Sequence, residues 1–168
     1  NKRININMNK NYLLPGKPLR KGVDLIADKK SGALIVIGNS NKLEKISSGG
    51  INLKNCIYSP EMLSELAKMD GAIIVDESVS TILKANVHLN PSDNLQTSET
   101  GTRHRTAERV SIETSLKVIA VSEESSAIKV FHDSKVNELE EPSMILGRVS
   151  ESLQSVDRMR RRFDEVLL

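Results

Sequence analysis

Aromatic side chains are scarce in this sequence: they make up 2% of the residues, and tryptophan is absent. A stacking platform for single-stranded nucleic acid depends on such rings, so we exclude it, and the core must be aliphatic. The single cysteine, Cys56, excludes an internal disulfide and cysteine-rich zinc spacing, and it is compatible with a reducing cytoplasm. No apolar run approaches the roughly 20 residues that a membrane-spanning helix needs, and no signal-peptide pattern is found. We therefore expect no membrane anchor and a cytoplasmic location.

The excess of one charge sign is small. The formal net charge is +2 over 168 residues, which is too little to argue for nucleic-acid binding by itself. Charged residues make up 27% and hydrophobic residues 38% of the chain, the balance of an ordinary globular protein. The length is that of one domain with a substantial core.

Hydrophobic periodicity and turn residues predict alternating helices and strands. Residues 1–12 are predicted to form a flexible arm, with an edge strand as the alternative, and the polar residues 39–50 are predicted to be mostly loop. Helices are predicted over residues 18–30, from Ser59-Pro60 onward, over 102–114 and from Pro142 onward. Strands are predicted over residues 33–37, 72–75, 81–89, 117–122 and 127–132. The strands over 72–75 and 81–89 are predicted to pair as a hairpin. Helices that flank short buried strands predict an α/β fold with a mixed β-sheet.

The end of the sequence carries a heptad stripe. Apolar residues recur from Leu146 to Leu167 in alternating steps of three and four, interrupted only at Arg160. The stripe predicts a long C-terminal helix, which either packs as a single helix or pairs with another helix. A cluster of arginines on it belongs either to a solvated helix face or to a DNA contact; its members are Arg158, Arg160, Arg161 and Arg162.

A cationic segment around an Arg-His-Arg triplet carries the first functional signal. Arg103 and Arg105 bring planar, permanently charged groups that match phosphate oxygens. Gly101 permits a ligand to approach the backbone closely, and the hydroxyls of Thr102 and Thr106 add neutral donors. A helix that begins near Thr102 adds the positive potential of its free amide groups. The segment predicts a polyanion site, and the alternative is a solvated, charged helix start.

A second motif, Asp70-Gly71-Ala72, precedes this triplet by about thirty residues. Alone it is a weak signal, because a helix can end there and turn into a buried strand. Together the two motifs resemble those of the diadenylate cyclase family, and segments 15–20, 31–38 and 85–91 resemble its DNA-integrity-scanning, DisA-type branch. The likeness runs from about Leu13 to the end of the chain.

The resemblance implies a diadenylate cyclase fold for residues 13–140. It also implies that the C-terminal helix, residues 141–168, is the start of a linker. The DNA-binding module that follows this linker in the family is absent from the sequence, so DNA binding is expected only through that missing module.

The activity that the resemblance implies is the condensation of two ATP molecules to cyclic di-AMP with release of two pyrophosphates. A carboxylate and a divalent metal, Mg²⁺ or Mn²⁺, are needed where the ribose 3′-hydroxyl loses its proton. Asp70 is the candidate metal ligand and orients that hydroxyl. Arg103 and Arg105 are expected to neutralise the phosphates and the leaving group. His104 can contact a phosphate, bind metal through a neutral nitrogen or brace the loop.

Further nucleotide contacts are implied by position in the family's pattern. Gly71 and Ala72 are expected on the ribose side, Leu89 beside the adenine and Ser122 at the phosphates. Taken alone, Leu89 is a core residue and Ser122 a strand-end cap. Ser122 follows a predicted strand, where ligand contacts in α/β sheets tend to lie.

The chemistry implies an assembly of at least two copies. One site holds one ATP, whose hydroxyl cannot reach its own α-phosphorus to make the symmetric product, so two sites must face one another across a two-fold axis. The family forms such face-to-face dimers and its DisA-type members form an octamer, so we expect a homo-oligomer. The alternatives from other classes are a non-catalytic sensor of ATP or cyclic di-AMP and a DNA-binding module that uses the arginine-rich helix.

Overall fold

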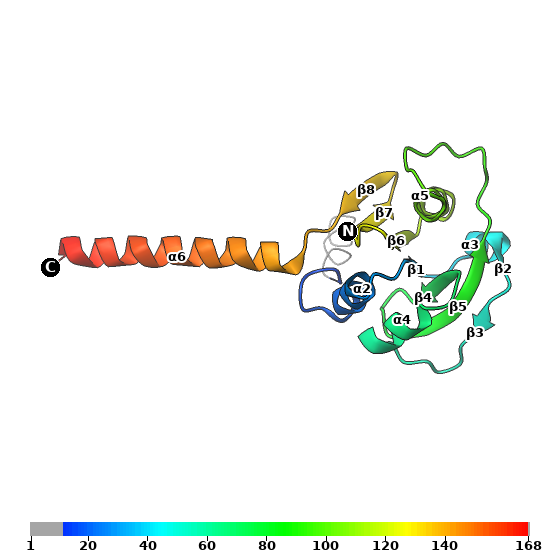
Figure 1. Cartoon of the computed structure of the whole chain (residues 1–168), viewed down its shortest axis with the longest axis horizontal. Coiled ribbons are helices and arrows are strands. Elements are labelled where there is room, and N and C mark those ends of the chain that lie inside the picture. Colours follow the sequence, from blue (N-terminus) through cyan, green and yellow to red (C-terminus); the bar gives the residue numbers. More distant parts are fainter. Residues whose placement is uncertain (1–11, 168) are drawn as a thin grey trace, which may run out of the picture. The chain divides into compact units, whose positions relative to one another are not determined.

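The computed structural model describes residues 12–167 (Figure 1). The arm predicted for residues 1–12 lies outside this range except for Tyr12, and Leu168 lies outside it as well. The chain divides into two compact units, one that reaches to Glu138 and one that begins at Leu139. The domain boundary predicted between residues 140 and 141 falls within the second unit.

A mixed sheet forms the centre of the first unit. Its strands are β1 (Ala33–Ile37), β2 (Ser47–Ser48), β3 (Ile51–Asn52), β4 (Ala72–Val75), β5 (Ile82–Leu89), β6 (Lys117–Val121), β7 (Ile128–His132) and β8 (Lys135–Glu138). They lie in the order β2-β5-β4-β1-β6-β7-β8, and β3 pairs with β5. Strand β1 pairs with β4 in parallel and with β6 in antiparallel orientation, so the sheet is mixed, as predicted. The short strands β2 and β3 and the exposed strand β8 were not predicted.

Helices cover both faces of this sheet, which confirms the predicted α/β fold (Figure 1). Helices α2 (Pro18–Asp28) and α4 (Pro60–Leu66) lie on one face, and α3 (Asn41–Ile46) and α5 (Thr102–Thr114) on the other. Leu34 and Val36 of β1 pack in one core cluster with Ala107 and Val110 of α5. Ile35 points to the opposite face, because neighbouring strand residues alternate, and it is also fully buried. Burial on both faces explains the continuous apolar run of β1.

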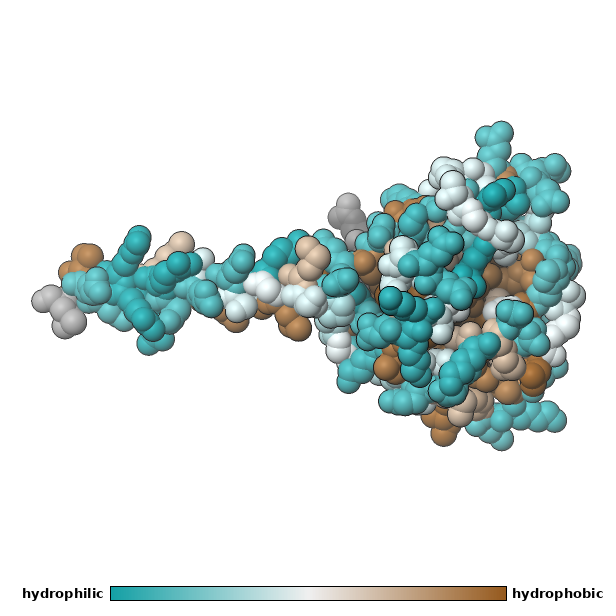
Figure 2. Space-filling model, in the orientation of Figure 1, coloured by the Kyte–Doolittle hydropathy of each residue, from teal (hydrophilic) through white to brown (hydrophobic). Residues whose placement is uncertain are grey.

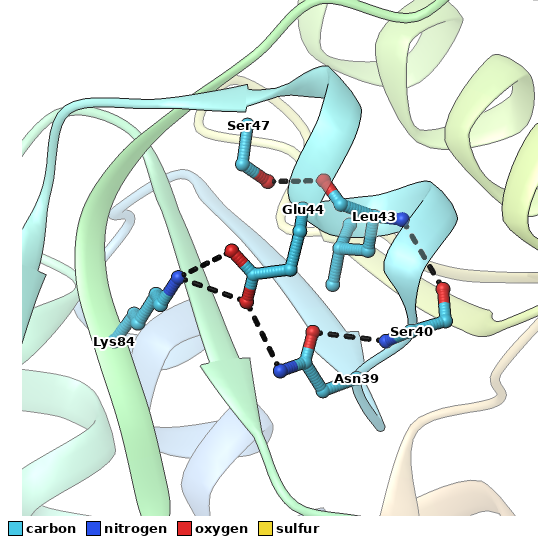
Figure 3. A network of polar contacts seen from close by, with 6 residues as sticks. All are labelled: Asn39, Ser40, Leu43, Glu44, Ser47 and Lys84. Carbon is cyan, nitrogen blue, oxygen red and sulfur yellow. Dashed lines mark hydrogen bonds and ion pairs between the residues drawn. The ribbon is translucent and has the colours of Figure 1, made fainter.

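The loop predicted for residues 39–50 is wrong, because α3 occupies its middle (Figure 3). Ser40 caps the helix, its hydroxyl accepting a hydrogen bond from the Leu43 amide at 3.1 Å. Leu43 is fully buried and anchors the helix on the sheet. On the outer side, the Lys84 ammonium of β5 donates to both carboxylate oxygens of Glu44, at 3.0 and 2.9 Å. These bonds lower the pKa of Glu44 below its ordinary value.

The β4–β5 hairpin is confirmed, and it contains a bulge beside its open end. The pairing passes from Ala72 opposite Val87 to Ile74 opposite Lys84, so β5 carries one extra residue there, and a second register shift follows between Ile74 and Val75. Asn86 adopts a φ of +54° within the bulge, and Gly71, just before β4, adopts +92°. A Cβ atom at Gly71 would lie 2.8 Å from the carbonyl oxygen of Val87, so the close approach of the two strands requires a glycine.

Helix α6 (Pro142–Leu167) makes up most of the second unit and confirms the predicted long C-terminal helix. None of the side chains described for it is buried, and its large apolar side chains are at least half exposed, apart from the partly buried Ile145. Figure 2 shows these apolar residues scattered among hydrophilic ones along the helix. Across residues 12–167, the structure contains no helix that combines the length and the apolar character needed to span a bilayer.

Candidate functional site

A cavity of about 950 Å³ lies at one end of the sheet. Its walls come from the beginnings of β1, β4 and β7, the ends of β5 and β6, and the first turn of α5. Every residue predicted for the site except Arg105 lines this cavity: Asp70, Gly71, Ala72, Leu89, Gly101, Thr102, Arg103, His104, Thr106 and Ser122. The structure thus brings together two motifs that are about thirty residues apart in the sequence.

Asp70 stands at the connection between α4 and β4. The Met69 amide donates to the Leu66 carbonyl at 3.2 Å, which continues the helical turn to the edge of the cavity. Gly71 then redirects the chain into β4 with its positive φ. The Asp70 side chain is exposed at the cavity wall, where it is free to meet a ligand.

The first turn of α5 directs positive potential into the cavity. Gly101 precedes the helix with a φ of +83°, and among the described residues no side chain caps this end. The first intrahelical bond runs from the Arg105 amide to the Gly101 carbonyl at 3.1 Å, so the amides ahead of it have no partner within the helix. Gly101, Thr102 and Thr106 line the cavity, so these free amides and two threonine side chains lie at its wall. Such a helix start suits an anion.

The two arginines of the triplet diverge. The Arg103 side chain is half-buried, and its guanidinium reaches across to the backbone of Gly32 at the start of β1. Arg105 is exposed and is not among the residues that line the cavity. Positions two apart on a helix point in nearly opposite directions, so in this conformation the triplet presents only one of its guanidinium groups to the cavity. The predicted phosphate contact of Arg105 stays a prediction.

His104 lies half-buried between the cavity and the core. Its ring is 6.5 Å from that of Phe131 of β7, with the ring planes at 72°. Burial lowers the pKa of His104; Glu99 opposes this, and Lys129 and Arg103 reinforce it. The imidazole is therefore predominantly neutral at pH 7, a form in which one nitrogen can donate and the other can accept a hydrogen bond or bind a metal.

Leu89 and Ser122 lie at two strand ends that meet at the cavity. Leu89 ends β5 with 7% of its surface exposed, so it contributes to the core and to the cavity wall at once. Ser122 follows β6, and its hydroxyl accepts a hydrogen bond from the Ser125 amide at 3.2 Å. The Ser122 amide donates to the Ala127 carbonyl at 2.9 Å, which fixes the β6–β7 turn at the rim.

Several charged residues of the cavity were not predicted. The basic ones are Lys30, Lys68 and Lys129, and the acidic ones are Glu99, Glu123 and Glu124. The Lys129 ammonium pairs with the Glu99 carboxylate at 2.9 Å across the cavity wall. With Arg103 and Asp70 included, the cavity is lined by four basic and four acidic side chains. No sequence pattern marks these residues, because only the pairing of the strands and the loop before α5 bring them together.

The cavity offers few side-chain ligands for a divalent metal ion. Within residues 12–167, no group of three or more His, Cys, Asp or Glu side chains is arranged to hold a metal. Asp70 supplies an exposed carboxylate at the cavity wall, and Mg²⁺ commonly binds through one or two carboxylates together with substrate phosphates and water. The residues present therefore fit a metal that arrives with a phosphorylated ligand.

Sequence comparisons show which proteins the chain is similar to. Residues 20–136 match the profile of the family described as DAC, DisA bacterial checkpoint controller nucleotide-binding. The DNA integrity scanning protein DisA of Acidothermus cellulolyticus is 44% identical over 92% of the chain and 42% of its own length. DisA of Kineococcus radiotolerans is 45% identical over 92% of the chain and 43% of its own length. The chain thus spans about two fifths of the length of these curated relatives.

Solved structures share the fold. A crystal structure of a DacA double mutant from Staphylococcus aureus has a TM-score of 0.59 and 29% identity, over 78% of this chain and 89% of that one. A hypothetical membrane spanning protein from Bacillus cereus has a TM-score of 0.63 over 73% of this chain and 62% of that one, and its 24% identity supports the fold alone. With the profile matched over more than half of the sequence, the chain belongs to the DAC family, the DisA bacterial checkpoint controller nucleotide-binding family.

Proposed function

We propose that this chain is a diadenylate cyclase domain, which condenses two ATP molecules to cyclic di-AMP and two pyrophosphates. In each of two steps, the 3′-hydroxyl oxygen of one ATP bonds to the α-phosphorus of the other. The bond from that phosphorus to the bridging oxygen breaks, and pyrophosphate leaves with the electron pair. The hydroxyl proton passes to solvent.

One observation carries the proposal: a single cavity combines the Asp70 carboxylate with the Arg103 guanidinium and the open start of α5. The carboxylate suits the hydroxyl side of the reaction, and the cationic wall suits the triphosphate and the charge that grows on the leaving group. The volume of about 950 Å³ is at the upper end of the range for small-molecule sites. The family described as nucleotide-binding supports the same ligand class.

Each side chain receives a role. Asp70 orients the 3′-hydroxyl, and Arg103 with the hydroxyls of Thr102 and Thr106 binds phosphate oxygens. The neutral His104 braces the first turn of α5 against Phe131 and offers one polar nitrogen. Asp70 would also hold the Mg²⁺ or Mn²⁺ that the proposal includes, which polarises phosphate oxygens when bound. Because the charged side chains of the cavity are equal in number and opposite in sign, a triphosphate needs such cations to be neutralised.

The proposal requires two copies of the chain facing one another. One cavity presents one set of motif residues, whereas the symmetric product needs two nucleotides with each hydroxyl near the other α-phosphorus. Arg105 does not line the cavity of a single chain, so a phosphate contact for it requires either the facing copy or another side-chain rotamer. We place this activity in the cytoplasm, and we assign any contact with DNA to parts of the relatives' length that this chain does not cover.

The test is chromatography of the products after incubation with ATP and either Mg²⁺ or Mn²⁺. Cyclic di-AMP and pyrophosphate in a ratio of about 1:2 are expected, with a specific activity that falls steeply on dilution. Binding of ATP without any product would instead identify the chain as a nucleotide sensor. A specific activity that stays constant far below the dimer dissociation constant would contradict the shared site.

A further inference from the structure

Gly32 lies at the cavity wall, just before β1. The Arg103 guanidinium fills the space that a side chain at this position would occupy. A Cβ atom built on Gly32 would have as its three nearest neighbours the two terminal nitrogens and the central carbon of the Arg103 guanidinium. All three would be closer than atoms of a real side chain approach one another. The guanidinium therefore occupies the space that any other residue at position 32 would take.

The backbone gives no reason for a glycine at this position. The glycines with positive φ are Gly16, Gly38, Gly49, Gly50, Gly71 and Gly101, and Gly32 is not among them. Alanine is thus compatible with the backbone conformation at position 32. The atoms that it would displace are also mobile ones, since they form the far end of a long, flexible side chain. Gly71 differs on both counts, because its φ is positive and its neighbours are backbone atoms.

We propose that Gly32 is a positioning residue for the nucleotide site, and that it acts by leaving room for the Arg103 guanidinium. This inference rests on the proposed function, because it takes the phosphate group of a nucleotide as the partner of Arg103. The guanidinium of arginine binds phosphate through a planar fork, so its orientation matters as much as its charge. A methyl group at position 32 turns the fork away and leaves the fold intact.

The proposal predicts a selective defect in the Gly32→Ala variant. Its affinity for ATP in the presence of Mg²⁺, measured by calorimetry, is expected to fall by about tenfold to a hundredfold, the range for loss of a charge-assisted hydrogen bond. Its affinity for adenosine, which lacks phosphates, is expected to stay within about twofold of the wild type. Its melting temperature should also be unchanged, because only a side-chain end has to move.

Two comparisons separate this role from a general disturbance. Gly147→Ala is the matched control, because a Cβ there meets nothing within 4 Å and the residue lies in α6, outside the cavity. The double variant Gly32→Ala with Arg103→Ala should bind ATP no more weakly than Arg103→Ala alone, since one substitution acts through the other. A crystal structure of Gly32→Ala should show the guanidinium displaced from its place above residue 32.

The outcomes are distinct. If the wild type binds ATP and Gly32→Ala binds it equally well, the positioning role is refuted while the proposed function stands. Equal losses for ATP and adenosine, or a further loss on the Arg103→Ala background, also refute it. If the wild type fails to bind ATP at all, the proposed function fails and the inference fails with it.

Discussion

The turn between β4 and β5 depends on one carboxylate, and its contribution to stability can be measured through pH. Asp76 accepts hydrogen bonds from the amides of Ser80 and Thr81, both at 2.8 Å. It also accepts them from the hydroxyls of Ser78 and Ser80, at 2.5 and 2.7 Å. Partial burial acts to raise the pKa of Asp76, but these four bonds outweigh it and lower the pKa from 3.8 to about 2.

The difference between the pKa of Asp76 in the folded and in the unfolded chain sets the size and the direction of its pH-dependent contribution to stability. Well above pH 3.8 the carboxylate is ionised in the folded and the unfolded chain, and its full stabilising contribution is present. Between pH 3.8 and about 2 the unfolded chain binds a proton first, so the contribution is lost as the pH falls. Each pKa unit corresponds to about 1.4 kcal/mol, but part of the side chain faces solvent, so we expect ~1–2 kcal/mol.

The perturbation is Asp76→Asn, which keeps the shape and removes the charge. Urea unfolding of the wild type and the variant at pH 7, 4, 3 and 2 gives the difference in unfolding free energy at each pH. The difference should be ~1–2 kcal/mol larger at pH 7 than at pH 2. Glu138→Gln, at an exposed carboxylate of β8, is the control for the loss of one surface charge. An equal difference at pH 7 and pH 2 would refute the reasoning.

Three further predictions concern the site and its supports. Asp70→Asn and Arg103→Ala should each fold normally and lower the rate of cyclic di-AMP formation by about 10²–10³, and an unchanged rate in either would contradict its assigned role. Gly71→Ala should lower the unfolding free energy by about 2–4 kcal/mol in urea titrations, because its Cβ meets the backbone of β5; a loss below about 0.5 kcal/mol would show that the strands separate easily. Glu44→Gln should change stability by less than about 1 kcal/mol, and less still in high salt, because the Glu44–Lys84 pair faces solvent; a loss above 2 kcal/mol would contradict this.

Local sequence patterns predicted the sheet well where burial decides the structure. Strands β1 and β4 are short apolar runs buried on both faces, and a run of that kind has few other places in a globular domain. Helix α3 was missed because it has six residues and buries only Leu43 and Ile46, too few for a clear period. Its signal was the capping residue Ser40, three positions before Leu43.

The candidate site was predicted through motifs and not through physical patterning. Nothing in the spacing of Asp70 and Arg103 shows that they share a cavity. The prediction that they do came from the resemblance to a family. In the structure, the pairing of β1 with β4 and β6 brings the two residues to the same cavity. The resemblance did not separate Arg105 from Arg103, because a motif written as letters omits the direction in which helix residues point. Lys129 and Glu99 were missed, since their ion pair joins a loop to a strand about thirty residues away.

Strand β4 begins at the cavity and ends at the Asp76 turn, and this arrangement has a practical use for protein engineering. Five residues lie between Asp70 and Asp76, and the four of them that form β4 rise roughly 13 Å at about 3.3 Å per residue. Substitutions that far apart generally act independently. Mutant libraries that aim to raise thermal stability can therefore be confined to the Asp76 end of the sheet. The stability gained there can offset destabilising substitutions that change ligand preference at the cavity end.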